Sequence, residues 1–162
     1  LIFRHDIAYT GEKLNICRAL YYNLTGALLL KTNRDIQERL SLHLEAIAML
    51  PGCPLFYYHA AHLYYALGQY DTAAEHFQQC LAFGRHPAPD MSISYRRDIL
   101  GSWSLAGLGY CCFRKKNYAD ALRFFELSLE YTHDERIQAM VASSRMLAAK
   151  AGNPLSQNPV RA

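Results

Sequence analysis

The sequence predicts an all-α fold, a solenoid of about seven antiparallel helices. The first reason is an internal repeat, because residues 64–77 and 112–125 place small, apolar and aromatic residues in the same order. The second reason is composition: 51% of the residues are hydrophobic and 12% are aromatic, which is enough apolar material for a sizeable core. Charged residues make up 19%, whereas a disordered chain would be more polar and more highly charged.

Small residues and large rings occupy matching places in the two copies. The small residues are Ala61 and Ala73, then Gly109 and Ala121; the rings are Tyr64, Tyr70 and Phe77, then Tyr118 and Phe125. With these residues the chain resembles the tetratricopeptide repeat (TPR) family, whose unit of about 34 residues is a pair of antiparallel helices. The resemblance implies a right-handed solenoid, in which hairpins stack because one unit cannot bury its apolar face alone.

The repeat frame predicts a single TPR-like helical domain over residues 1–150. Its expected parts are units at about 20–53, 54–87 and 102–135, a capping helix over 134–150, and a loose C-terminal tail over 151–162. The first unit depends on Pro51 as its closing proline, and Arg39 and His43 depart from the family pattern in its second helix.

The elements between these units are also predicted. Residues 2–9 are expected to be extended, and a helix is expected from about Thr10 past Leu30. Residues 84–90 contain two prolines, which cannot lie inside a helix, so we expect a loop there. After this loop, Asp90 or Ser92 is expected to cap one long helix that ends near residue 116.

In the TPR family, fixed positions on the first helix of each unit line a concave groove. By this resemblance the residues that contact a partner are Tyr21, Lys31, Tyr58, His62, Tyr65, Trp103, Tyr110, Phe113 and Arg114. They predict an aromatic groove with sparse positive charge, suited to a protein or peptide segment with apolar anchors. The alternative is that these rings pack against the N-terminal helix or a neighbouring domain.

Some TPR domains grip the C-terminal carboxylate of a partner with lysine and asparagine. The matching positions here hold Tyr58, His62, Ala106 and Tyr110, so this carboxylate clamp is not expected. Nucleic acid is not expected as a partner, because the net charge is only +3 and the densest basic cluster is residues 114–116. Membrane insertion is not expected either, since no apolar stretch approaches the ~18 residues of a membrane span.

The sequence predicts no catalytic residue, metal site or cofactor, and the chain itself is not expected to be an enzyme. His59 with His62, and His76 with Cys80, offer two ligands each, whereas zinc needs three or four. The chain has no Gly-x-Ser-x-Gly motif and no glycine-rich phosphate loop. The five cysteines form no Cys-x-x-Cys pair, which favours a reducing compartment, the cytoplasm.

The first half of the chain shows a second resemblance. Ile2, His5 and Tyr9, followed by residues 33–51 and then a TPR hairpin, are similar to the C-terminal extension of some bacterial family-2 glycosyltransferases. The chain begins without methionine, so we expect a piece of a longer protein. The resemblance implies an alternative function, a non-catalytic accessory domain beside a catalytic domain in the same chain.

Overall fold

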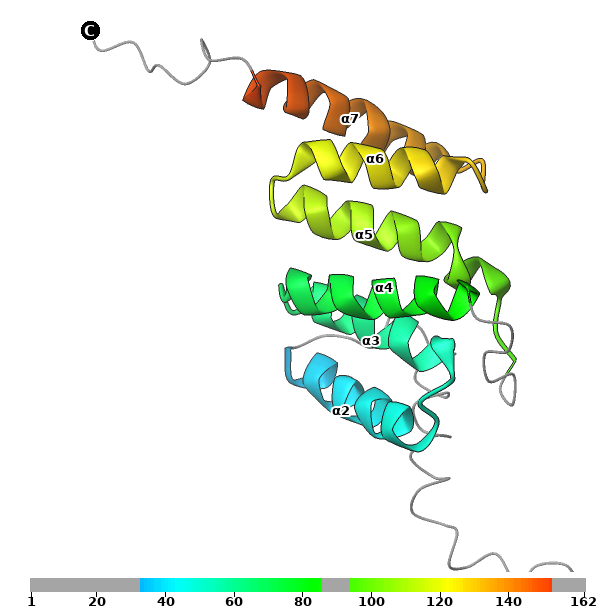
Figure 1. The fold of residues 1–162 in the computed structure, drawn as a ribbon. Coiled ribbons are helices and arrows are strands. Elements are labelled where there is room, and N and C mark those ends of the chain that lie inside the picture. Colours follow the sequence, from blue (N-terminus) through cyan, green and yellow to red (C-terminus); the bar gives the residue numbers. More distant parts are fainter. Residues whose placement is uncertain (1–32, 86–93, 153–162) are drawn as a thin grey trace, which may run out of the picture.

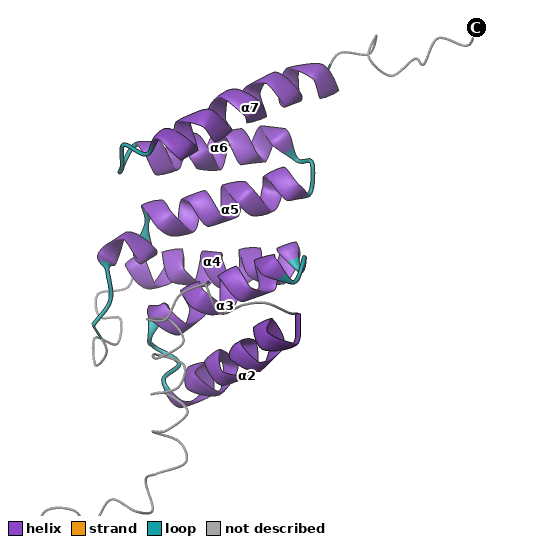
Figure 2. Ribbon diagram, turned by 180° about the vertical axis from the view of Figure 1, so that it is seen from behind, coloured by secondary structure: helices purple, strands orange, loops and turns teal. Residues whose placement is uncertain are grey.

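The computed structural model describes residues 33–85 and 94–152, which form a stack of helices (Figure 1). In chain order these are α2 (Asn33–Met49), α3 (Pro54–Ala66), α4 (Tyr70–Arg85), the short 3₁₀ helix η3 (Arg97–Leu100), α5 (Ser102–Arg114), α6 (Tyr118–Leu129) and α7 (Glu135–Ala151). Figure 2 shows the same stack from behind, and the two described ranges contain no strand. The predicted all-α solenoid is confirmed.

Each helix packs against the next one along the chain, from α2 on α3 to α6 on α7. In addition α3 contacts α5 directly, although α4 lies between them in sequence. This is the arrangement expected of stacked two-helix hairpins, in which each unit contacts mainly its neighbours. The stack therefore places α3 and α5, the first helices of the two clear copies, beside each other.

The two copies repeat the same ring contacts. Tyr65 meets Tyr70 at 5.3 Å between ring centroids and Phe113 meets Tyr118 at 5.3 Å, while His62 meets Phe77 at 5.1 Å and Tyr110 meets Phe125 at 5.0 Å. All four pairs are edge-to-face, the arrangement that aromatic quadrupoles favour. The residue pattern therefore corresponds to equivalent packing in three dimensions.

Small residues allow the helices to approach closely, as the repeat predicts. Ala61, Ala73 and Ala121 are fully buried. A Cβ atom added to Gly109 would lie 2.6 Å from the ring of the buried Phe125, a distance that real Cβ atoms do not reach. Glycine at this place is thus required by packing.

The turns inside the two hairpins have the same backbone geometry but different residues. Gly68 ends the first helix of one hairpin with φ 78°, and Lys116 ends that of the other with φ 63°. Both are in the left-handed region, where a side chain costs about 1 kcal/mol or more and glycine does not. In both turns the following N–H closes the helix end: Gln69 donates to the Tyr64 carbonyl and Asn117 to the Cys112 carbonyl, each at 2.9 Å.

The prediction of one long helix ending near residue 116 is wrong. The segment is divided into η3 and α5 at Gly101, whose φ of −148° and ψ of −106° are not helical. The Ser104 hydroxyl donates to the Ile99 carbonyl at 2.6 Å and holds this junction. The 3₁₀ helix also packs on the end of α4, where a Cβ on Gly84 would lie 2.7 Å from the Leu100 carbonyl oxygen. Tertiary packing therefore ends the helix early.

Arg39 and His43, the departures from the family pattern, are both buried in α2. The Nδ1 atom of His43 lies 2.8 Å from the Arg39 carbonyl oxygen, one turn earlier, and therefore donates its proton to it. The His43 ring also meets the Phe56 and His59 rings of α3 at 6.3 and 5.8 Å. A neutral histidine thus fills the place of an apolar residue between α2 and α3.

Some predictions concern residues outside the two described ranges. These are the extended segment 2–9, the helix from Thr10 past Leu30, the loop residues 86–90 with the caps Asp90 and Ser92, the partner-contacting residues Tyr21 and Lys31, and the tail from residue 153 to 162.

Candidate binding groove

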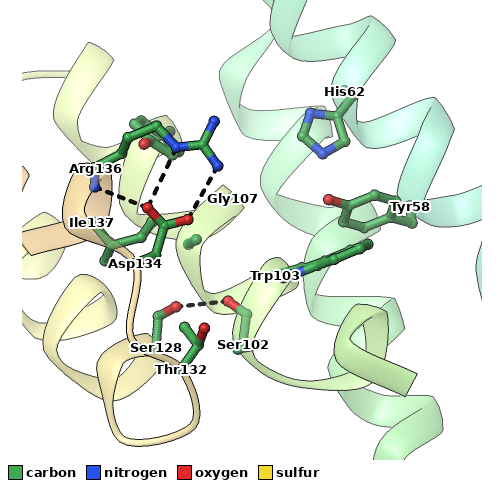
Figure 3. Close-up of a pocket in the computed structure, with 12 residues that line it drawn as sticks. Tyr58, His62, Ser102, Trp103, Gly107, Ser128, Thr132, Asp134, Arg136 and Ile137 are labelled. Atoms are coloured by element: carbon green, nitrogen blue, oxygen red, sulfur yellow. Dashed lines mark hydrogen bonds and ion pairs between the residues drawn. The ribbon is translucent and has the colours of Figure 1, made fainter. Parts of the chain in front are cut away.

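Helices α3 and α5, together with the start of α7, enclose an open cavity of about 370 Å³. We call it the first cavity (Figure 3). It is lined by Tyr58, His62, Ser102, Trp103, Ala106, Gly107, Tyr110, Ser128, Thr132, Asp134, Arg136 and Ile137. Its volume lies within the ~300–1,000 Å³ range of natural ligand pockets.

One wall of the first cavity is aromatic. Tyr58 and His62 lie one turn apart on α3, and their rings meet edge-to-face at 4.6 Å. Trp103, in the first turn of α5, lies 6.0 Å from Tyr58 between ring centroids. Burial raises the pKa of Tyr58 to about 12, so its hydroxyl keeps its proton at neutral pH and can donate a hydrogen bond. His62 is exposed to solvent.

The floor of the first cavity is made of two small residues on α5, Ala106 and Gly107, both buried. Behind Gly107 lies the Phe77 ring of α4; a Cβ on Gly107 would lie 2.5 Å from its Cζ atom. Glycine at position 107 therefore lets α5 approach the Phe77 ring of α4 closely.

The opposite wall comes from the start of α7 and is charged (Figure 3). The Asp134 carboxylate caps α7 by accepting the Arg136 backbone N–H at 2.9 Å, and it pairs with the Arg136 guanidinium at 3.2 Å. Hydrogen bonds from Arg136 hold the pKa of Asp134 below its usual value, so it is ionised at neutral pH. Below it, the Ser128 hydroxyl donates to the Ser102 carbonyl at 2.8 Å.

A smaller second cavity, of about 270 Å³, adjoins the first. It is lined by His62, Tyr65, Phe77, Gly107 and Tyr110, and so shares three of its five lining residues with the first cavity. The two cavities together form one aromatic groove along α3 and α5, and we use this name for them below.

The structure brings five of the predicted contact residues together in this groove. Tyr58, His62, Trp103 and Tyr110 line the first cavity, and His62, Tyr110 and Tyr65 line the second. Phe113 and Arg114 line neither: Phe113 packs on Tyr118, and the Arg114 Nε donates to the Tyr70 hydroxyl at 2.9 Å.

Sequence reasoning missed the charged wall. The sequence predicts residues 134–150 only as a capping helix. Continuing the frame of about 34 residues from Ser102 places Arg136 and Ile137 at the first two positions of a further unit. This extension of the repeat would have predicted that α7 lines the groove.

The described residues also limit which chemistry this region can perform. Within residues 33–85 and 94–152 no group of three or more His, Cys, Asp or Glu residues could hold a metal ion. Burial raises the pKa of the Cys80 and Cys111 thiols to about 12, so both are protonated and weakly nucleophilic at neutral pH. The groove offers apolar surface and hydrogen-bonding groups, which are suited to binding.

Comparison with known proteins supports the same fold. Residues 55–83, which cover most of α3 and most of α4, match the family model of the tetratricopeptide repeat. The whole stack is similar to a solved structure, the Sgt2 TPR domain from Aspergillus fumigatus, with a TM-score of 0.63. That match has 16% sequence identity and covers 93% of this chain and 87% of the other. The fold is TPR-like.

No curated protein matches the chain. The repeat match and the Sgt2 match lend no support to the glycosyltransferase resemblance, which depends mostly on residues before Asn33 and stays a prediction. Among the described helices, none is long and apolar enough to cross a membrane.

Proposed function

We propose that this TPR-like domain is a protein-interaction module that binds a protein or peptide segment in the aromatic groove. The observation that supports it best is the convergence of Tyr58 and His62 from α3 with Trp103 and Tyr110 from α5 on one open cavity. Tyrosine, tryptophan and arginine are the side chains that most often dominate binding energy at protein interfaces. TPR domains are typically modules of this kind.

The shape and chemistry of the groove suit a segment with one or two apolar anchors. An aliphatic or aromatic side chain would rest on Ala106 and Gly107, between Trp103 and Ile137. The polar groups on its rim, among them Thr132 and the Asp134 and Arg136 pair, are available to the backbone of the segment. We expect a segment of this kind to release water from the apolar walls while its backbone stays hydrogen-bonded.

The alternative is that the rings serve internal packing alone. One contact agrees with it, since the Tyr58 ring meets that of the core residue Phe77 at 5.9 Å. Both cavities, however, are open among the described residues. An accessory role beside a glycosyltransferase has no such observation in its favour. For the compartment we propose the cytoplasm, because Cys80, Cys111 and Cys112 carry no disulfide.

A pull-down with purified variants tests the groove. The first variant carries Tyr58→Ala, Tyr65→Ala and Trp103→Ala; the second carries only His62→Glu, which places a charge on an exposed position of the groove. The matched control is Tyr131→Ala, because Tyr131 is 71% exposed and lines neither cavity.

We expect both groove variants to lose the partners that the wild type and the Tyr131→Ala control retain. Circular dichroism melting must show that each variant is folded; the single His62→Glu variant guards against unfolding of the triple one. If folded groove variants recover the same partners at the same yield as the wild type, the groove is not the binding surface.

A further inference from the structure

Arg114, in the last turn of α5, lies at the border of the second cavity. Its Nε donates to the Tyr70 hydroxyl at 2.9 Å, and its guanidinium carbon lies 5.6 Å from the centroid of the Tyr70 ring. Tyr70 in turn meets Tyr65, which lines the second cavity, at 5.3 Å. Tyr70 thus holds the Arg114 guanidinium beside the aromatic groove, and Arg114 is exposed to solvent. This contact uses Nε, and the N–H groups of the two Nη atoms donate to no other group among the described residues.

The charges around the groove distinguish Arg114 from its neighbours. Arg96, whose guanidinium lies over the Trp103 ring, pairs with Asp98 at 3.0 Å. Arg136 pairs with Asp134, and Lys115, next to Arg114, pairs with Asp71. In the part of the chain that the structure describes, no carboxylate forms such a pair with Arg114. Its positive charge is therefore available to a partner of opposite charge.

The spacing along α5 sets where the opposite charge must lie. Tyr110, which lines both cavities, precedes Arg114 by one turn, which is about 6 Å along the helix axis. An extended peptide advances about 3.3 Å per residue, so it covers this distance in about two residues. An apolar side chain in the second cavity would therefore place a side chain about two positions away near the guanidinium.

We propose that the aromatic groove selects a segment that carries an aspartate or glutamate about two residues from an apolar anchor, with the carboxylate bound by Arg114. The inference rests on the proposed function and adds a specificity to it. Planar guanidinium N–H groups match a carboxylate better than any other common anion-binding side chain does. The bound group is a side-chain carboxylate rather than the C-terminal carboxylate of a chain. The positions of the carboxylate clamp hold Tyr58, His62, Ala106 and Tyr110 in place of lysine and asparagine.

A peptide selection tests this specificity without knowledge of the natural partner. The probe is a library of random peptides displayed within a carrier protein, so that no peptide has a free C-terminus. A length of about ten residues is sufficient, because Trp103 and Arg114 lie about 16 Å apart along α5, which about five extended residues span. The full chain is used as wild type, as Arg114→Glu and as Trp103→Ala. The matched control is Arg123→Glu, because Arg123 is also an exposed arginine over an aromatic ring, Phe124. Among the described residues Phe124 makes no ring contact with a residue of the groove, whereas Tyr70 meets Tyr65.

We expect the wild type and Arg123→Glu to enrich peptides with an acidic residue near an apolar one, and Arg114→Glu to enrich lysine or arginine at that place. An unchanged acidic preference in Arg114→Glu would overturn the proposal, while the proposed function stands if Trp103→Ala still loses the apolar preference. If the wild type enriches no apolar pattern that Trp103→Ala loses, the groove function itself is wrong and the inference fails with it.

A double-mutant cycle with one enriched peptide then measures the contact itself. Glu→Gln in the peptide and Arg114→Gln in the protein should each weaken binding about threefold, the effect of an exposed ion pair. The combination should weaken it no further, because each change removes the same contact. If the two changes instead weaken binding independently, so that their effects multiply, the peptide carboxylate and Arg114 are not in contact.

Discussion

Replacing Gly107 with alanine adds one methyl group at the floor of the aromatic groove. The added Cβ would lie 2.5, 2.6 and 2.7 Å from the Cζ, Cε1 and Cε2 atoms of the Phe77 ring. Carbon atoms in contact normally lie about 3.5–4.0 Å apart, so the ring or α5 must move by about 1 Å. Phe77 is 1% exposed and packs in a cluster with Ala61, Ala73 and Leu108, so a movement of the ring disturbs these contacts.

The net effect on stability follows from two opposing contributions. Overpacking a closed core typically costs about 1–3 kcal/mol. Alanine is a better helix former than glycine by about 1 kcal/mol, which offsets part of this cost. We therefore expect Gly107→Ala to lower the free energy of unfolding by about 1 kcal/mol, and the melting temperature by several degrees.

Urea denaturation followed by circular dichroism measures this change. Gly152→Ala is the matched control, because Gly152 has the right-handed helical conformation and a Cβ there would come no closer than 3.5 Å to another atom; we expect it to stay within about 0.5 kcal/mol of the wild type. In a double variant, Phe77→Leu should remove most of the penalty of Gly107→Ala, because the ring atoms that collide are gone. A Gly107→Ala protein as stable as the wild type, or more so, would refute the close packing of α4 and α5.

Three further predictions concern charge, backbone and thiols. Burial lowers the pKa of His43, and it lowers the pKa of His59 to about 3. In the unfolded chain both histidines have pKa values near 6.5, so below pH 6.5 the unfolded chain binds more protons than the folded one. The contribution of these neutral histidines to the free energy of unfolding is therefore fully present above pH 6.5 and is lost progressively between pH 6.5 and about 3. In urea titrations at pH 5 we expect a loss of about 2 kcal/mol from His59 alone. The His59→Gln variant should show a weaker dependence of stability on pH. Lys116→Gly should raise the free energy of unfolding by about 0.5–1 kcal/mol in the same urea assay, since φ at this residue is 63°; a loss of stability would mean that the turn is not left-handed. The buried Cys111 should react with a thiol reagent only as fast as the domain opens, whereas the half-buried Cys112 should react faster. Mass spectrometry measures both rates, and equal rates would contradict the burial of Cys111.

Much of the fold could be predicted because helix packing leaves a periodic trace in the chain. Tyr70 and Tyr118 each begin the second helix of a hairpin, and each meets an aromatic residue five positions earlier, at the same distance. The repeat alone pointed to this equivalence, since a hairpin that stacks on a copy of itself needs the same small and large residues at the same places. Even the substitution of Lys116 for the turn glycine left the backbone of the turn unchanged.

The groove was predicted only in part, for a different reason. A rule for positions on the first helix of each unit found Tyr58, His62, Tyr65, Trp103 and Tyr110, because these residues repeat with the helices that carry them. It could not show that the Phe113 ring turns toward Tyr118 rather than into a cavity. Side-chain direction depends on neighbours that the local pattern does not contain.

By itself the sequence determined the helical hairpins, their order and the small residues at which they meet, because these follow from local periodicity. Only the tertiary structure decided that α5 begins at Ser102, after η3 has packed on α4, and that His43 is buried as a neutral side chain against α3. It also decided that Asp134 and Arg136 face Tyr58 and Trp103 across one cavity. Those outcomes depend on contacts between segments distant in sequence, and their energies exceed the local preferences that a sequence pattern reports.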